Sequence, residues 1–289
     1  MLYDTLISPF VEFAFMRRAL VGAFALALGA GPVGVFLMLR RMSLVGDAMA
    51  HAILPGAAIG FLVSGLSLFA MTAGGLIAGF VIAVGAGIVA RATELKEDAS
   101  LAAFFLISLA VGVTIVSLKG TNIDLLHFLF GSVLALDDAA VMLVAGITTV
   151  TLMVLAAIYR PLVLECFDPQ FLRSASSLSS PTHFTFLVLV VLNLVAGFQA
   201  LGTLMAVGIM LLPAVAARFW AEDVSGMILV AVLIAFLSSM TGLLVSYYAN
   251  LPTGPAIILT CGVVYLLSIL VGARGGLIYR LVPRKHLEA

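Results

Sequence analysis

Long apolar stretches fill almost the whole chain and restrict it to folds that are stable in a lipid bilayer. Of its 289 residues, 63% are hydrophobic and only 10% are charged. A bilayer core of about 30 Å is crossed by about 20 apolar helical residues, which leaves room for about eight or nine transmembrane helices with short loops. The sequence therefore predicts an all-α, polytopic membrane bundle in which residues 1–289 form a single transmembrane domain.

The basic residues between the apolar stretches predict how the chain crosses the membrane. The mixed segment 3–16 is too short to cross and is expected to lie at the interface. Basic residues recur in the later loops and place them in the cytoplasm, which leaves the N-terminus outside and makes Arg17 and Arg18 an exception. The expected spans are 19–39, 44–66, 68–90, 100–118, 139–159, two within 184–217, 226–248 and 255–272.

The apolar run 184–217 is too long to be one span. As a single helix its 34 residues would be about 51 Å long, which exceeds the thickness of the membrane. Gly202, close to Gln199 and ahead of Pro213, is the expected break, because glycine tolerates backbone conformations that end a helix. We therefore expect two helices that turn back at the outer side.

Two ionisable residues, Asp47 and His51, stand four residues apart in an otherwise apolar span. On a helix both side chains share one face, where a carboxylate oxygen and an imidazole nitrogen can bind one divalent ion. An ionisable group in the membrane costs about 2.5–3.5 kcal/mol and normally faces a cavity or a partner. The alternative is a hydrogen bond between the two that serves packing alone. Pro55, one turn further, either frees a backbone carbonyl for a passing cation or only kinks the helix.

The cytoplasmic loop expected at 160–182 contains a short helix of its own. Asp168 is suited to cap this helix, and Pro169 would occupy its first turn. Lying across the cytoplasmic surface, the helix would expose Phe171 and Leu172 for docking into a groove of a soluble partner. A solvated connector is the alternative.

Three further polar residues are candidates for a pathway through the membrane. His127 lies in the segment 122–132, which is too short to span and is expected to form an outer-facing helix or half-helix. It could help to receive a cation, or it could be a hydrogen-bonded core residue. Gln199 and Asn250 lie in or beside spans, where hydrogen bonds between helices would explain both without transport.

The segment Arg40–Gly56 reads RRMSLVGDAMAHAILPG and resembles the signature of ABC-type permeases for zinc, manganese and iron. Other segments resemble the same family in the same order, so that the resemblance extends over about residues 15–272. These segments are Phe128–Ser132, Phe167–Pro169, Gln199–Thr203 and Leu251–Ala256. Asn250 departs from the aspartate expected before the last of them.

The resemblance implies a homodimer of permeases that works with a cytoplasmic ATP-binding subunit and an extracytoplasmic metal-binding protein. It also implies that Asp47 and His51 lie on the metal pathway. The loop helix would be seated in the ATPase, and the residues implied in this contact are Phe167, Asp168, Pro169, Phe171, Leu172 and Arg173.

The chain has no GxxxxGK[ST] phosphate loop, so ATP would be hydrolysed by the partner and the chain is not expected to be an enzyme. The sequence thus predicts the permease of an ATP-driven importer in the plasma membrane of a bacterium. Its cargo would be a divalent metal, zinc or manganese or else iron, with no permanently bound cofactor. Zero net charge gives no reason to expect nucleic acid. The alternatives are an importer of a metal chelate on a related scaffold and an intramembrane metal-dependent enzyme.

Overall fold

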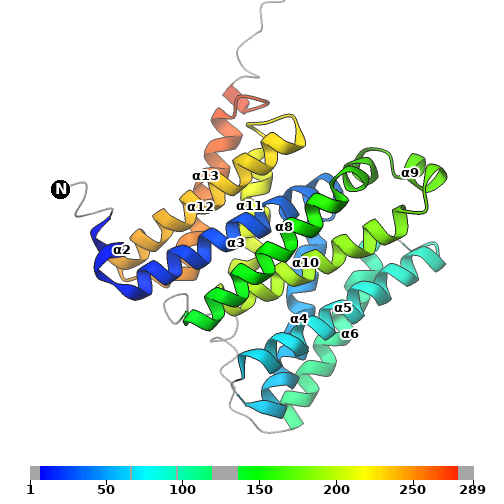
Figure 1. The fold of residues 1–289 in the computed structure, drawn as a ribbon, viewed down its shortest axis with the longest axis horizontal. Coiled ribbons are helices and arrows are strands. Elements are labelled where there is room, and N and C mark those ends of the chain that lie inside the picture. Colours follow the sequence, from blue (N-terminus) through cyan, green and yellow to red (C-terminus); the bar gives the residue numbers. More distant parts are fainter. Residues whose placement is uncertain (1–6, 66, 96, 119–135, 279–289) are drawn as a thin grey trace, which may run out of the picture.

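The computed structural model describes residues 7–65, 67–95, 97–118 and 136–278 of the chain. Within these residues the chain forms helices and no strand, so the expected all-α bundle is confirmed (Figure 1). The helices are α2 (Ser8–Glu12), α3 (Ala14–Leu39), α4 (Ser43–Ser64), α5 (Leu68–Ala92), α6 (Glu97–Leu118), α8 (Asp138–Phe167), α9 (Pro169–Ala175), α10 (Ser179–Leu201), α11 (Thr203–Ala217), α12 (Val224–Ala249) and α13 (Thr253–Val271).

Seven of the described helices are long and apolar enough to cross a membrane. Two shorter apolar stretches, Ala99–Gly112 in α6 and Met205–Ala217 in α11, add to them, which agrees with the expected eight or nine spans. Polar residues in the loops cap three of these helices. Ser67, Asp137 and Asp223 each accept a hydrogen bond from the backbone N–H three residues further along, at the start of α5, α8 and α12.

Gly202 separates α10 from α11, as the length of the apolar run predicts. Its φ of 87° and ψ of 164° lie in a region that residues with a Cβ rarely adopt. The two helices then pack so closely that a Cβ on Gly197 would lie under 3.0 Å from Ala206. The glycine therefore both ends α10 and lets α11 return beside it.

The centre of the bundle is formed by α3 and α10, whose most apolar windows are 78% and 72% buried. α3 packs against α8, α11 and α12, and α10 packs against α5, α8 and α11. Phe36 of α3 and Phe186 of α10 are fully buried and meet edge to face at 6.3 Å between ring centroids. The helices α4, α5 and α6 pack on one another and form the lower right part of the molecule in Figure 1.

One of the two basic residues near the N-terminus, Arg18, forms an ion pair with another helix. Nε of Arg18, in the first turns of α3, lies 2.9 Å from Oδ1 of Asp138 at the start of α8. This ion pair gives Arg18 a partner of opposite charge at the expected outer end of the bundle.

Two expected boundaries differ from the structure. The lead-in 3–16 ends earlier than expected, because α3 already begins at Ala14; in the described part from residue 7 on, α2 and a break at Phe13 precede it. The loop 160–182 is also narrower, since α8 continues through Pro161 to Phe167. Leu162 and Glu165 in this continuation are buried, so tertiary packing extends the helix beyond the point where the basic Arg160 suggests a loop.

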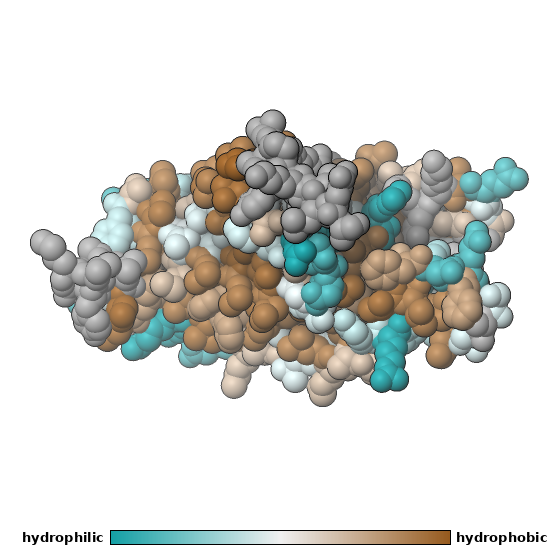
Figure 2. Space-filling model, turned by 90° about the horizontal axis from the view of Figure 1, so that it is seen from above, coloured by the Kyte–Doolittle hydropathy of each residue, from teal (hydrophilic) through white to brown (hydrophobic). Residues whose placement is uncertain are grey.

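Much of the protein surface is apolar, as a membrane protein requires. Figure 2 shows that hydrophobic side chains cover most of the described part of one face, interrupted by small groups of polar residues. Large side chains such as Phe69 of α5 and Met142 of α8 are 82% and 77% exposed. In water such a surface would be a liability, whereas in lipid it costs nothing.

Candidate functional site

A tight turn sets the position of α4, which carries Asp47 and His51. The N–H of Met42 donates to the carbonyl of Leu37 at 2.9 Å, and the N–H of Arg41 donates to the carbonyl of Met38 at 3.0 Å. These two bonds form a Schellman motif, and Arg41 adopts the left-handed φ of 58° that this motif requires. α4 therefore starts at a fixed angle to α3, one turn before Asp47.

Asp47 and His51 face the same side of α4, as their spacing predicts. Oδ1 of Asp47 lies 3.8 Å from Nε2 of His51, which is too long for a hydrogen bond. Two donors bound to one metal ion at about 2.1 Å each can be up to about 4 Å apart, so this separation fits a shared ion. The side chains are 62% and 36% exposed in the isolated chain. The packing alternative, a direct hydrogen bond between the two, is therefore absent from the structure.

The pair lies on a stripe of α4 whose residues are exposed or partly exposed in the isolated chain. Its members recur at intervals of three and four residues, the spacing of a seam between two packed helices. They are Leu44, Asp47, His51, Leu54 and Ala58. The His51 ring also contacts Phe105 of α6, at 5.8 Å between ring centroids, which helps to fix its orientation. This aromatic contact is not visible in the sequence, because Phe105 lies in another helix.

The remaining faces of α4 are packed too tightly to move easily. A Cβ on Gly56 would lie under 3.0 Å from backbone atoms of Gly74, so α4 and α5 touch along their backbones. In the same way, Gly112 of α6 leaves room for the ring of Pro55. Because Pro55 has no N–H, the carbonyl of His51 receives no helical hydrogen bond from position 55. A backbone oxygen is thus available beside the imidazole.

The short helix α9 has the predicted cap but a different exposed surface. Oδ1 of Asp168 accepts a hydrogen bond from the N–H of Phe171 at 2.9 Å, and Pro169 is the first residue of the helix. Phe167 and Phe171 are 68% and 55% exposed. The expectation that Leu172 is exposed is wrong, because its side chain is only 4% exposed and anchors α9 to the protein. The side chain of Arg173 lies outside the described part of the structure.

The other three candidates have different outcomes. Nε2 of Gln199 donates to Oγ1 of Thr72 in α5 at 3.2 Å, so a hydrogen bond between helices accounts for this residue. Asn250 is exposed and ends α12 with a left-handed φ of 52°, which asparagine tolerates better than most residues. His127 lies outside the described residues. No group of three or more His, Cys, Asp or Glu side chains able to hold a metal occurs within the described residues.

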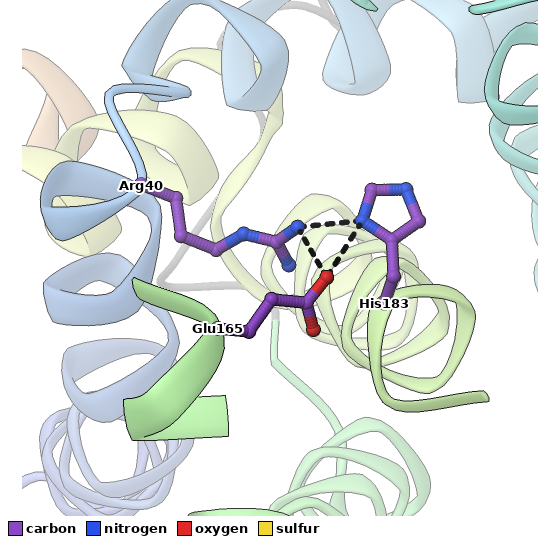
Figure 3. A network of polar contacts seen from close by, with 3 residues as sticks. All are labelled: Arg40, Glu165 and His183. Carbon is purple, nitrogen blue, oxygen red and sulfur yellow. Dashed lines mark hydrogen bonds and ion pairs between the residues drawn. The ribbon is translucent and has the colours of Figure 1, made fainter. Parts of the chain in front are cut away.

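A buried charged cluster at the end of α3 was missed by the sequence analysis (Figure 3). Nη2 of Arg40 donates to Nδ1 of His183 at 2.5 Å and lies 3.4 Å from Oε1 of Glu165. The three residues come from α3, α8 and α10, with sequence separations of 125 and 143 residues. The sequence offered one signal for this cluster, which is that Glu165 stands at the end of an apolar run. A charge that is buried there needs a partner.

Comparison with known proteins agrees with these features. The chain matches the ABC 3 transport family over residues 12–272. It is 32% identical over 263 residues to the manganese import system permease protein ScaB of Streptococcus parasanguinis, with 91% of this chain and 92% of that protein covered. It is 29% identical over 279 residues to the manganese transport system membrane protein MntC of Halalkalibacterium halodurans, with 96% and 93% covered.

Solved structures show the same fold. The structure of PsaBC from Streptococcus pneumoniae in complex with Fab matches with a TM-score of 0.83 at 27% identity, covering 96% of this chain and 99% of that chain. A transporter described as metal-chelate type, in an inward-facing conformation, matches with a TM-score of 0.70 over 91% and 87% of the two chains. Its identity of 13% bears on the fold alone.

The relatives are named as permeases or membrane proteins of transport systems, which confirms that the chain is a transport subunit and not an enzyme. Its apolar helices make it a multi-pass protein of the bacterial plasma membrane. With nearly its whole length matched by one family description, the chain belongs to the ABC 3 transport family of membrane permeases.

Proposed function

We propose that this chain is the permease of an ATP-driven importer that carries Mn²⁺ into the cytoplasm along a pathway lined by Asp47 and His51. Two copies form the transmembrane part, a separate ATP-binding subunit contacts α9, and an extracytoplasmic protein delivers the metal. The observation that carries the proposal is the exposed pair on α4, with its oxygen and nitrogen donors 3.8 Å apart.

The exposure of this pair argues for a second copy. A carboxylate on a membrane helix does not face lipid, because burying an ionised group there costs at least about 2.5 kcal/mol. Asp47 must therefore face water or protein, and the stripe around it has the spacing of a helix seam. If α4 of two copies met along this seam, two carboxylates and two imidazoles would surround one ion. Four such donors match the needs of a divalent transition metal.

The choice of manganese rests on the relatives, because the donors accept zinc as well. ScaB and MntC are both named for manganese, and each covers more than nine tenths of this chain. Zinc is the second candidate, since neutral imidazole and carboxylate also suit Zn²⁺.

The test is the metal content of cells whose only copy of the permease carries Asp47→Asn, grown under metal limitation. This change removes the charge and keeps the shape of the side chain. Glu222→Gln, at an exposed acid in the loop between α11 and α12, is the matched control. We expect cells with Asp47→Asn to lose manganese selectively at equal membrane levels of protein, while the control stays normal. Loss of zinc alone would change the assigned cargo, and an unchanged profile would refute the pathway role of Asp47.

A further inference from the structure

The cluster of Arg40, Glu165 and His183 is closed off from solvent. The three side chains are 9%, 4% and 5% exposed. Figure 3 shows the three groups in a triangle, in which the guanidinium of Arg40, the carboxylate of Glu165 and the imidazole of His183 each face the other two. The guanidinium also lies over the ring of Phe186, 5.1 Å from its centroid. Three ionisable side chains in a buried place are costly, and apolar residues of similar volume would hold three helices together at least as well. The cluster therefore calls for a reason beyond packing.

Arg40 and Glu165 each have a second polar atom that could form a further hydrogen bond between them. Nη1 of Arg40 and Oε2 of Glu165 are both buried without a hydrogen-bond partner among the described residues. The present contact between the two residues uses one nitrogen and one oxygen at 3.4 Å. Arginine and carboxylate pair more strongly when two parallel hydrogen bonds form between them. A small movement of the end of α8 relative to α3 would exchange the present arrangement for the two-bond one. The contact between Arg40 and Glu165 therefore has two discrete hydrogen-bonding arrangements, one with a single bond and one with two.

The cluster lies between α9, the proposed contact with the ATPase, and the start of α4, which carries the proposed metal-binding pair. Glu165 lies in the last turn of α8, three residues before Asp168, the cap of α9. His183 is the fifth residue of α10, the helix that follows α9. The cluster thus joins the two helices that flank α9. Arg40 ends α3 and enters the tight turn that starts α4, seven residues before Asp47.

We propose that Arg40, Glu165 and His183 form a positioning cluster that transmits movement of α9 to α4. A displacement of α9 by the ATP-binding subunit would shift the ends of α8 and α10, and through Arg40 it would turn the start of α4 with its metal-binding pair. The three side chains are buried inside the bundle, so they are assigned a positioning role and not a binding one. This inference rests on the proposed function, since it assigns α9 to the ATPase contact and α4 to the pathway.

The test uses the permease assembled with its ATP-binding subunit in lipid vesicles, and it measures ATP hydrolysis and Mn²⁺ uptake on the same sample. His183→Leu removes the acceptor for Arg40, whereas His183→Asn keeps a polar acceptor close to the position of Nδ1. We expect His183→Leu to hydrolyse ATP at a rate near that of the wild type while the Mn²⁺ delivered per ATP falls at least about fivefold. The asparagine variant should restore most of this ratio.

The double variant Arg40→Met and Glu165→Met tests the cluster in a protein that is expected to fold. Removing one partner would leave an unpaired buried charge, but removing both leaves none, so the double variant should remain stable. We expect it to be folded and uncoupled. A control variant, Thr151→Val, removes the buried hydrogen bond that Asn193 of α10 donates to α8, at 2.9 Å, away from α9. This variant should keep the wild-type ratio.

A second readout does not depend on the identity of the cargo. Ala48→Cys, beside Asp47, is labelled with a thiol reagent in a background in which Cys166 and Cys261 are replaced by alanine. Its reactivity should change when ATP is added to the otherwise unaltered protein, and it should not change in His183→Leu. If ATP changes the reactivity of the unaltered protein but not that of His183→Leu, and no Mn²⁺ moves, the proposed cargo is wrong and the cluster is still supported. Wild-type coupling in both His183→Leu and the double variant would overturn the inference.

Discussion

Replacing Gly56 by alanine should force α4 away from α5 and move the Asp47 and His51 pair with it. A Cβ at this position would lie under 3.0 Å from the carbonyl oxygen of Gly74 and from the Cβ of Ala78. The oxygen belongs to a helix backbone and cannot swing aside, so the helices would have to separate by about 1 Å. Overpacking of this kind costs about 1–3 kcal/mol.

The matched control for this change is Gly146→Ala on α8. A Cβ on Gly146 meets nothing within 4 Å, so the substitution should only remove the backbone freedom of glycine. It should therefore stabilise the helix by about 0.5–1 kcal/mol. The two variants add the same methyl group to a helix and differ only in what that group meets.

The two variants are compared by thermal unfolding in detergent and by Mn²⁺ uptake at matched membrane levels. The expected difference corresponds to a melting temperature roughly 2–10 °C lower for Gly56→Ala than for Gly146→Ala. Uptake should fall for Gly56→Ala alone, because α4 carries Asp47 and His51, the proposed metal-binding pair. Equal melting temperatures would show that α4 and α5 can separate freely, and the argument for a rigidly held α4 would then be wrong.

Three further results are expected. Asp168→Ala should destabilise α9 by about 1 kcal/mol and weaken co-purification of the ATP-binding subunit, whereas Asp168→Ser should retain both. Asn250→Gly should keep Mn²⁺ uptake if the residue serves the left-handed backbone at φ 52°, and uptake should fall if its amide binds metal. Hydrogen bonds from the N–H of Gly226 and the hydroxyl of Ser225 lower the pKa of Asp223 from its usual 3.8. Its contribution to stability is therefore present above that value and lost as the pH falls through the lowered pKa, so Asp223→Asn should lessen acid sensitivity in a pH series of melting curves.

The span pattern of this fold could be predicted from the sequence because lipid imposes a length and a polarity on every crossing segment. The break at Gly202 follows from the same constraint, since 34 apolar residues cannot cross as one helix. The common face of Asp47 and His51 follows from helix geometry alone. Each of these inferences concerns residues that are close in the sequence, where backbone geometry decides the outcome.

Contacts between distant helices could not be predicted in the same way. Arg40 meets His183 across 143 residues, and no local pattern identifies this partner. The burial of Leu172 is a similar case, because a short amphipathic helix exposes some apolar residues and buries others, and only tertiary packing decides which. The extension of α8 to Phe167 also depends on burial of its last turn rather than on the residues that form it.

The way α4 is packed limits where the rest of the metal site can come from. Gly56 and Gly60 lie against α5, Gly46 lies against α3 and α11, and Pro55 lies against α6, which leaves the stripe with Asp47 and His51 as the open face of α4. The described residues of one chain give this site one carboxylate and one imidazole, fewer donors than a bound transition metal needs. Additional ligands must therefore approach from outside the face of α4. In the proposed homodimer, a second copy along the same stripe would supply them with matching chemistry, because a two-fold axis beside α4 would repeat both donors. A metal held between two such helices would be released when they turn relative to each other, so rotation at the start of α4 would control both binding and release.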